Sequence, residues 1–112
     1  LVNGGRMSDG RSLIREDLIK RYTTQQVSGW NNSVKTYLRL GRGFMLGTPT
    51  PSFFGWWGTS GCFGHAGMFS SLAYGDYKTG VSVAIITNGN RGVGDFMKRF
   101  IPLSHGIIKA CA

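Results

Sequence analysis

The sequence predicts an α+β fold in which antiparallel sheet strands are flanked by helices. Three observations predict it: a short helical pattern near the start, apolar and aromatic stretches separated by glycine-rich turns in the middle, and a long helical pattern at the end. A chain of 112 residues is long enough for one modest core. We therefore expect a single unit over residues 1–112.

The first half should hold one helix and one strand. Arg15 to Tyr22 has the apolar spacing of a short helix. Thr36 to Leu46 alternates as a strand does, and Gly41 and Gly43 inside it indicate a bulge or a close neighbour. Residues 47–61, rich in Pro, Gly and aromatic residues, should form a loop.

The second half should hold a hairpin and a helix. Phe69 to Tyr74 is the first expected strand, Gly75 to Gly80 its turn, and Val81 to Thr87 the second strand. The second strand has few polar positions, which is typical of a strand covered on both faces. A helix is expected from about Asp95 to Cys111, on an apolar stripe of Phe96, Phe100, Leu103, Ile107 and Cys111, and Pro102 should kink or restart it.

The composition excludes some functions and leaves others open. Thirteen Lys and Arg against five Asp and Glu give a net charge of +8. This charge fits a basic face, half of an interface whose acidic half lies elsewhere, or contact with nucleic acid or an anionic membrane. The basic residues are scattered and match no nucleic-acid-binding motif, which argues against nucleic acid.

Other classes of protein find little support in the sequence. No apolar run is long enough for a membrane span. Two Cys are too few for a disulfide scaffold, and two His without a Cys-x-x-Cys pair argue against structural zinc. We expect no metal or cofactor, and the cysteines leave the cellular compartment open.

The informative stretch runs from Phe63 to Tyr74 and contains His65-Ala66-Gly67. The turn Asp76 to Gly80 follows it, and then a strand that ends at Ile86-Thr87-Asn88. This order resembles the β-lactamase-related serine hydrolases, which include penicillin-binding proteins, class C β-lactamases, D-aminopeptidases and β-lactamase-like carboxylesterases. In that family a Lys/His-x-Gly triplet opens an edge strand, a second strand returns after a turn and ends near Thr-Asn, and a C-terminal helix packs on the sheet.

The resemblance extends upstream over nearly the whole chain. Residues 1–5 resemble the family's end-of-helix Leu-x-Asn-Gly-Gly, residues 13–24 its next helix, and residues 41–47 its Gly-Leu-Gly-Phe-x-Leu-Gly strand. These segments correspond to the C-terminal portion of a β-lactamase/transpeptidase-like domain. Because the chain also starts at Leu1 rather than Met, we expect a segment of a longer domain.

The resemblance implies roles for the triplet and the residues after it. The backbone N–H of Met68 would be an oxyanion donor, and Gly67 would let the backbone approach the substrate. His65 would stand where other members carry Lys and contact a substrate carboxylate or the catalytic network. A titratable His favours ester or peptide substrates over penicillin hydrolysis. Ala66 and Phe69 would line the substrate site.

Two neighbouring features need separate interpretation. The aromatic cluster that includes Trp56 and Trp57 could wall an acyl-binding pocket near His65, or could pack under the long loop; the sequence leaves both open. Lys78-Thr79-Gly80 matches the family's Lys-Thr-Gly motif in letters. It follows Gly75-Asp76, however, so we predict a turn with a positive φ at Gly80.

The family's nucleophile segment is missing from this sequence. No serine is followed by Lys at the Ser-x-x-Lys spacing, and the Tyr-x-Asn segment is not in the region covered. We therefore expect the C-terminal half-site of a serine hydrolase that acts on small ester, amide or lactam substrates through an acyl-enzyme. A missing N-terminal segment or partner chain would supply the nucleophile. The alternative is a catalytically inactive remnant that acts as an interaction or oligomerisation module.

Overall fold

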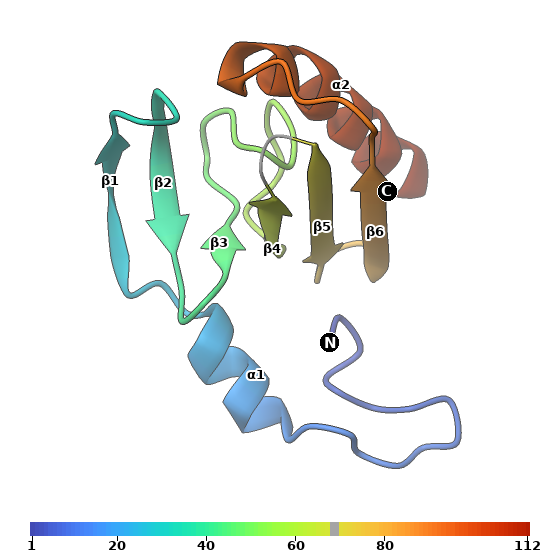
Figure 1. Cartoon of the computed structure of the whole chain (residues 1–112). Coiled ribbons are helices and arrows are strands. Elements are labelled where there is room, and N and C mark those ends of the chain that lie inside the picture. Colours follow the sequence, from blue (N-terminus) through green and yellow to red (C-terminus); the bar gives the residue numbers. More distant parts are fainter. Residues whose placement is uncertain (68–69) are drawn as a thin grey trace.

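The computed structural model describes residues 1–67 and 70–112, and within them six strands form one antiparallel sheet in the order β1-β2-β3-β4-β5-β6 (Figure 1). A long helix, α2, packs on one face of the sheet, and a short helix, α1, lies near the opposite end. The predicted α+β class is confirmed. The elements are α1 Glu16–Thr23, β1 Val27–Asn31, β2 Thr36–Leu40, β3 Met45–Leu46, β4 Cys62–Gly67, β5 Ser71–Asp76, β6 Val81–Ile86 and α2 Val93–Cys111.

The single strand predicted over residues 36–46 is wrong, because the chain reverses inside it. β2 ends at Leu40 and pairs with β3 after a tight turn in which Gly41 N–H donates to the carbonyl of Phe44. Gly43 takes a φ of +84°, which L side chains rarely adopt. The close neighbour expected at Gly41 is confirmed, since a Cβ there would collide with the carbonyl oxygen of Tyr22.

Two strands lie where the sequence indicated none. β1 pairs with β2 along its whole length. Four of its five residues are exposed, so its sequence lacks the alternation of apolar and polar residues that predicts a strand. β4 is a strand of its own and runs antiparallel to β5 from the pair Cys62–Asp76 to the pair Gly67–Ser71. His65-Ala66-Gly67 therefore closes a strand, whereas the family pattern had it open one.

The hairpin of β5 and β6 is confirmed, but Gly75 and Asp76 belong to β5 rather than to the predicted turn. The prediction that the second strand is covered on both faces is wrong. The residues of β6 alternate between half-buried and exposed, and Ile86 is 85% exposed. Val83 and Ile85 pack against the core under α2, while Ser82 and Ala84 face the other side of the sheet. Residues 81–86 contain few polar side chains because the half-buried and the exposed positions of β6 alike hold small or aliphatic residues.

The core lies between α2 and the adjacent face of β4, β5 and β6. Phe96, Phe100 and Ile108 pack with Leu72 and Tyr74 and with the loop residues Phe53 and Phe54. The buried stripe of α2 is Phe96, Phe100, Ile101, Ser104 and Ile108, whereas Leu103 and Cys111 are exposed, so the predicted stripe is correct only in its first two residues. Phe96, Phe100, Ser104 and Ile108 are spaced four residues apart, and with 3.6 residues per turn they lie on one face of the helix.

The helix continues through Pro102 without a restart. Neither helix in the described part of the chain is long and apolar enough to cross a membrane.

Candidate functional site

The His65-Ala66-Gly67 triplet occupies the last three positions of β4, and its side chains alternate between the two faces of the sheet. Ala66 points toward α2 and packs against the core. His65 therefore faces the opposite side, where its ring is exposed. This opposite face is covered at its far end, where Val2 lies against Gly75, but not beside His65.

The imidazole of His65 is held by its own strand. Its Nδ1 lies 2.6 Å from the carbonyl oxygen of Ala66. A carbonyl can only accept, so Nδ1 carries the hydrogen and donates it. In the neutral ring this leaves the lone pair on Nε2, which is thus the nitrogen able to accept a proton or a hydrogen bond.

The triplet lies at an open stretch of strand edge. On one side β4 pairs with β5 through all three residues; on the other, β3 pairs with β4 only as far as Gly64. The carbonyl of Cys62 accepts from Gly47 N–H on the β3 side, and main-chain groups point to the same edge at every second residue. The main-chain groups of Ala66 therefore point to the edge that β3 leaves unpaired within the described residues.

Met68, the predicted oxyanion donor, lies outside the described residues, as does Phe69. The chain is described again from Ser70, whose N–H donates to the carbonyl of Gly67 at 3.1 Å. Thr87 in turn donates from both its N–H and its hydroxyl to the carbonyl of Ser70. These bonds join Ser70 both to the end of β4 and to Thr87, the residue after β6.

A shallow hollow of about 350 Å³ lies beside the triplet on β4, β5 and β6. The sequence did not indicate its other walls, which are Ser71, Leu72 and Ala73 of β5 and Ala84, Ile85 and Ile86 of β6. The hydroxyl of Ser71 donates to the carbonyl of Gly67 at 3.2 Å. The predicted hairpin register could have pointed to these residues, because small side chains at alternate positions of both strands leave space over His65.

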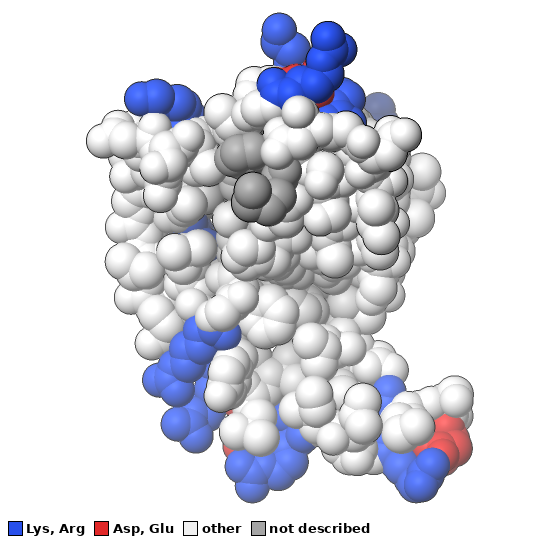
Figure 2. Space-filling model, viewed as in Figure 1, with Lys and Arg blue, Asp and Glu red and all other residues white. Residues whose placement is uncertain are grey.

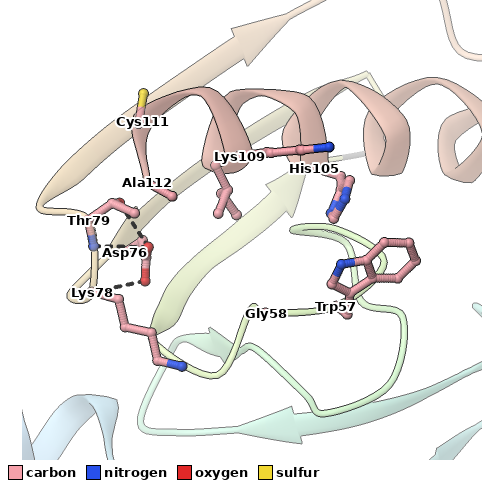
Figure 3. Close-up of a pocket in the computed structure, with 10 residues that line it drawn as sticks. Trp57, Gly58, Asp76, Lys78, Thr79, His105, Lys109, Cys111 and Ala112 are labelled. Carbon is pink, nitrogen blue, oxygen red and sulfur yellow. Dashed lines mark hydrogen bonds between the residues drawn. The ribbon is translucent and has the colours of Figure 1, made fainter.

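The two tryptophans predicted to bind substrate are both exposed, and the structure does not bring Trp57 to His65. The indole of Trp57 packs edge-on against His105 of α2, with ring centroids 4.6 Å apart. It lines a different cavity, together with Asp76 and Lys78 (Figure 3). Asp76 pairs with Cys62 at the start of β4, about 17 Å along the strand from Gly67.

The aromatic cluster is thus divided by burial. Phe53 and Phe54 are buried in the core, while Trp56 and Trp57 are exposed. The packing interpretation therefore holds for Phe53 and Phe54, whereas Trp57 lines a cavity away from His65.

The turn predicted for Lys78-Thr79-Gly80 is confirmed. The carboxylate of Asp76 accepts hydrogen bonds from the N–H groups of Lys78 and Thr79 and from the Thr79 hydroxyl. Gly80 has a φ of +73°. The Lys-Thr-Gly letters therefore lie at the end of the β5–β6 hairpin away from His65 and reflect turn chemistry.

The buried thiol of Cys62 is not activated, and the described residues form no cluster of metal ligands. Burial raises the pKa of the Cys62 thiol to about 12, and the nearby Asp76 carboxylate adds to the shift, so the thiolate is strongly disfavoured. Cys111 is an exposed free cysteine. Within the described ranges no three His, Cys, Asp or Glu side chains gather as metal ligands.

The basic charge is spread over separate parts of the surface. Figure 2 shows Lys and Arg at the upper and lower margins of the molecule, with a broad uncharged surface between them. Several cations have acidic neighbours, such as Lys20, which lies 2.9 Å from Glu16. The surface in this view lacks the continuous basic stripe that nucleic-acid binding favours.

Comparison with known proteins gives a consistent family. The family model described as Beta-lactamase matches residues 2–103. Among solved structures, a penicillin-binding protein homolog from Caulobacter crescentus is 32% identical and superposes with a TM-score of 0.74. The match covers 99% of this chain and 29% of that one, so the chain spans less than a third of that solved structure. No curated protein matches the sequence.

Proposed function

Because this chain belongs to the Beta-lactamase family, we propose that it forms the C-terminal half-site of a serine hydrolase that works through an acyl-enzyme. The observation that carries the proposal is the triplet at the end of β4, paired on one side only. It combines an open main-chain edge with an exposed His65 over a hollow large enough for a small substrate group. A small ester, amide or lactam suits such a site.

The main chain after Gly67 would stabilise the oxyanion. Backbone N–H groups at a strand edge are fixed by the sheet, so they need no reorganisation as negative charge develops on the substrate oxygen. In this proposal Met68 supplies one such N–H, and the missing nucleophile supplies the other. Any side chain at position 67 would meet the Ser71 hydroxyl and crowd the approach of the substrate.

His65 would act through Nε2. With Nδ1 bound to the Ala66 carbonyl, the ring is oriented and Nε2 is the atom that meets substrate or partner groups. A neutral ring accepts a hydrogen bond from the catalytic network, and a protonated ring donates one to a substrate carboxylate. The main chain of Ala66, which borders the hollow, would contribute to substrate binding. The predicted substrate contacts of Phe69, Trp56 and Trp57 remain predictions.

The nucleophile has to come from elsewhere. No serine in this sequence has the Ser-x-x-Lys spacing, and an oxyanion donor alone cannot form an acyl-enzyme. The remaining 71% of the Caulobacter crescentus homolog indicates how much chain can accompany a segment of this kind. The N-terminal segment or partner chain would bring the serine, the lysine and the tyrosine to the open edge of β4.

Native mass spectrometry of the protein purified from its own cells is the first test. We expect a larger species, whose additional residues or partner chain react with a fluorophosphonate probe at a serine. In that assembly His65→Ala should lower kcat for p-nitrophenyl acetate about 100-fold, as loss of a positioned proton-transfer group does. The matched control is Lys98→Ala on the exposed surface of α2, which should leave kcat unchanged.

Two results would contradict the proposal. Unchanged turnover of His65→Ala would remove His65 from the site. A preparation that contains only 112-residue chains and takes up no probe would instead support an inactive interaction module. The edge of β6, which pairs with no other described strand, and the exposed Ile86 favour that second function, because an open apolar strand edge is a site for pairing with another chain.

A further inference from the structure

A chain of hydrogen bonds joins the segment before α2 to the end of β4 that carries the triplet. β6 ends beside the triplet, since Gly67 pairs with Ser71 and Ser71 with Ile86 (Figure 1). Thr87, the residue after β6, donates to the carbonyl of Ser70 from its N–H at 2.8 Å and from its hydroxyl at 3.0 Å. The N–H of Ser70 donates in turn to the carbonyl of Gly67 at 3.1 Å. Thr87 is therefore linked to the last triplet residue through Ser70.

Arg99 of α2 orients the hydroxyl of Thr87. Its Nη1 donates to Thr87 Oγ1 at 3.2 Å, and the hydroxyl hydrogen of Thr87 is directed to Ser70. The guanidinium has two further contacts: Nε lies 2.7 Å from the Asp95 carboxylate, and Nη2 donates to the carbonyl of Gly89 at 3.3 Å. A positively charged donor polarises the hydroxyl that accepts from it and so strengthens the bond that this hydroxyl donates.

The bonds to Gly67 orient the peptide unit that ends the triplet. Its carbonyl accepts from the N–H of Ser70 at 3.1 Å and from the Ser71 hydroxyl at 3.2 Å. A peptide unit is planar, so contacts that orient its carbonyl also orient the N–H on its other side. In the proposed function this N–H is the one that meets the oxyanion. Its direction matters, because such a donor acts only within hydrogen-bonding distance of the developing charge.

We propose that Thr87 and Arg99 are positioning residues for the oxyanion donor at the end of β4, an inference that rests on the proposed hydrolase function. Neither residue lines the hollow beside the triplet, so both act through Ser70 and Gly67 and not on the substrate. Loss of the Thr87 hydroxyl would leave the main-chain bond to Ser70 in place and remove the contact that Arg99 strengthens. The rate should suffer more than substrate binding, because an oxyanion donor acts mainly in the transition state.

Thr87→Val tests the proposal, because it removes the hydroxyl and keeps the branched shape of the side chain. In the active assembly it should lower kcat for p-nitrophenyl acetate about ten-fold and change KM less than about two-fold, as expected for a misplaced transition-state contact. Thr87→Ser retains a hydroxyl and should restore most of kcat. The matched control is Thr79→Val, since the Thr79 hydroxyl also donates, to Asp76 at 2.8 Å, but at the other end of the hairpin. Its kcat should equal that of the parent.

Arg99→Met tests the more distant part of the chain of hydrogen bonds. It should lower kcat about three-fold, and the double variant with Thr87→Val should be no slower than Thr87→Val alone, because Arg99 acts through Thr87. Equal kcat of Thr87→Val and Thr79→Val would overturn the proposal, as would a Thr87→Ser variant as slow as Thr87→Val. Multiplied losses in the double variant would overturn the role of Arg99. Thermal melting of each variant shows whether it is folded.

Amide hydrogen exchange of Ser70 separates this inference from the proposed function, because the measurement needs no turnover. The Ser70 N–H should exchange about ten-fold faster in Thr87→Val than in the parent, since the local structure opens more easily, and Thr79→Val should not change it. Unchanged exchange in Thr87→Val would overturn the positioning role even in an active assembly. A parent without turnover would contradict the hydrolase function, and the exchange of Ser70 would still decide whether Thr87 holds the end of the triplet.

Discussion

Single positions in β4 determine how closely its neighbours approach. A Cβ at Gly64 would collide with the carbonyl oxygen of Ala73 and with Tyr74 across the β4–β5 pair. Gly64 directly precedes His65, so the close contact that requires glycine also fixes the start of the triplet. The requirement for glycine here comes from the neighbouring strand, because Gly64 is not among the residues with positive φ.

We predict that Gly64→Ala destabilises the chain by about 1–3 kcal/mol, the usual cost of overpacking a close contact. Urea denaturation followed by circular dichroism measures it. The matched control is Gly29→Ala in β1, where a Cβ would meet nothing within 4 Å. Equal stability of the two variants would contradict the close approach of β4 and β5.

Cys62 should make stability depend on alkaline pH. Burial raises its pKa from an ordinary 9.0 to about 12, so the unfolded chain loses this proton before the folded chain does. The stability contributed by the neutral thiol is complete below pH 9 and is lost as pH rises toward 12. Within this window the slope contributed by one such group is about 1.4 kcal/mol per pH unit.

The measurement compares the parent with Cys62→Ala by denaturant unfolding at several pH values between 8 and 11. The parent should lose stability more steeply above pH 9. Burial also raises the pKa of Tyr74 to about 12; this largest cause is common to both proteins, and only the smaller contribution of Cys62 differs between them. Parallel curves would show that the folded state does not disfavour the thiolate.

At the scale of elements, the β5–β6 turn is organised by one buried carboxylate. Asp76 ends β5, pairs with both Cys62 and Val81, and accepts three hydrogen bonds from the residues that follow it. It thereby fixes the register of β6 against β5. It also shapes one wall of the cavity that Lys78 and Lys109 line.

Asp76→Ala should destabilise the chain by about 1–3 kcal/mol, because the N–H groups of Lys78 and Thr79 lose the buried carboxylate that accepts their hydrogen bonds. Asp76→Asn retains one acceptor oxygen and should lose less. Thermal melting of the three proteins checks this order. An Asn variant as unstable as the Ala variant would mean that the negative charge, and not the hydrogen bonds, supports the turn.

At the scale of the whole molecule, the sheet is covered unevenly. α2 closes one face over β4–β6, while the face that carries His65 is open beside the triplet and the outer edge of β6 is unpaired within the described chain. The edge is formed by uncharged residues, Val81 to Ile86, without the Lys or Pro that commonly protects such an edge. Such an edge is a site for pairing with a second copy of the chain.

The isolated 112-residue chain should therefore self-associate as its concentration rises. Ile86→Lys should reduce this association, because a charge beside the open edge disfavours pairing with a second strand. Sedimentation velocity over a 100-fold concentration range measures it, with Lys98→Met as a control for changes in surface charge. A monomer at all concentrations would contradict the role of this edge.

Local chemistry explains what the sequence by itself determined. The α1 helix follows from apolar spacing, the β5–β6 turn from Asp76 and Gly80, and the start of the α2 stripe from Phe96 and Phe100. Each depends on residues close together in the chain, so their periodicity and turn chemistry are sufficient to predict them. The order of these elements around His65-Ala66-Gly67 also indicated the family that the comparisons support.

The tertiary structure decided what depends on distant partners. β1 becomes a strand only because β2 supplies its hydrogen bonds, and β6 has an exposed face because α2 covers only the other one. Trp57 lies with His105 at the far end of the sheet, although it is closer in sequence to His65. Strand pairing and burial join residues far apart in the chain, and one sequence read along its length does not specify which of them meet.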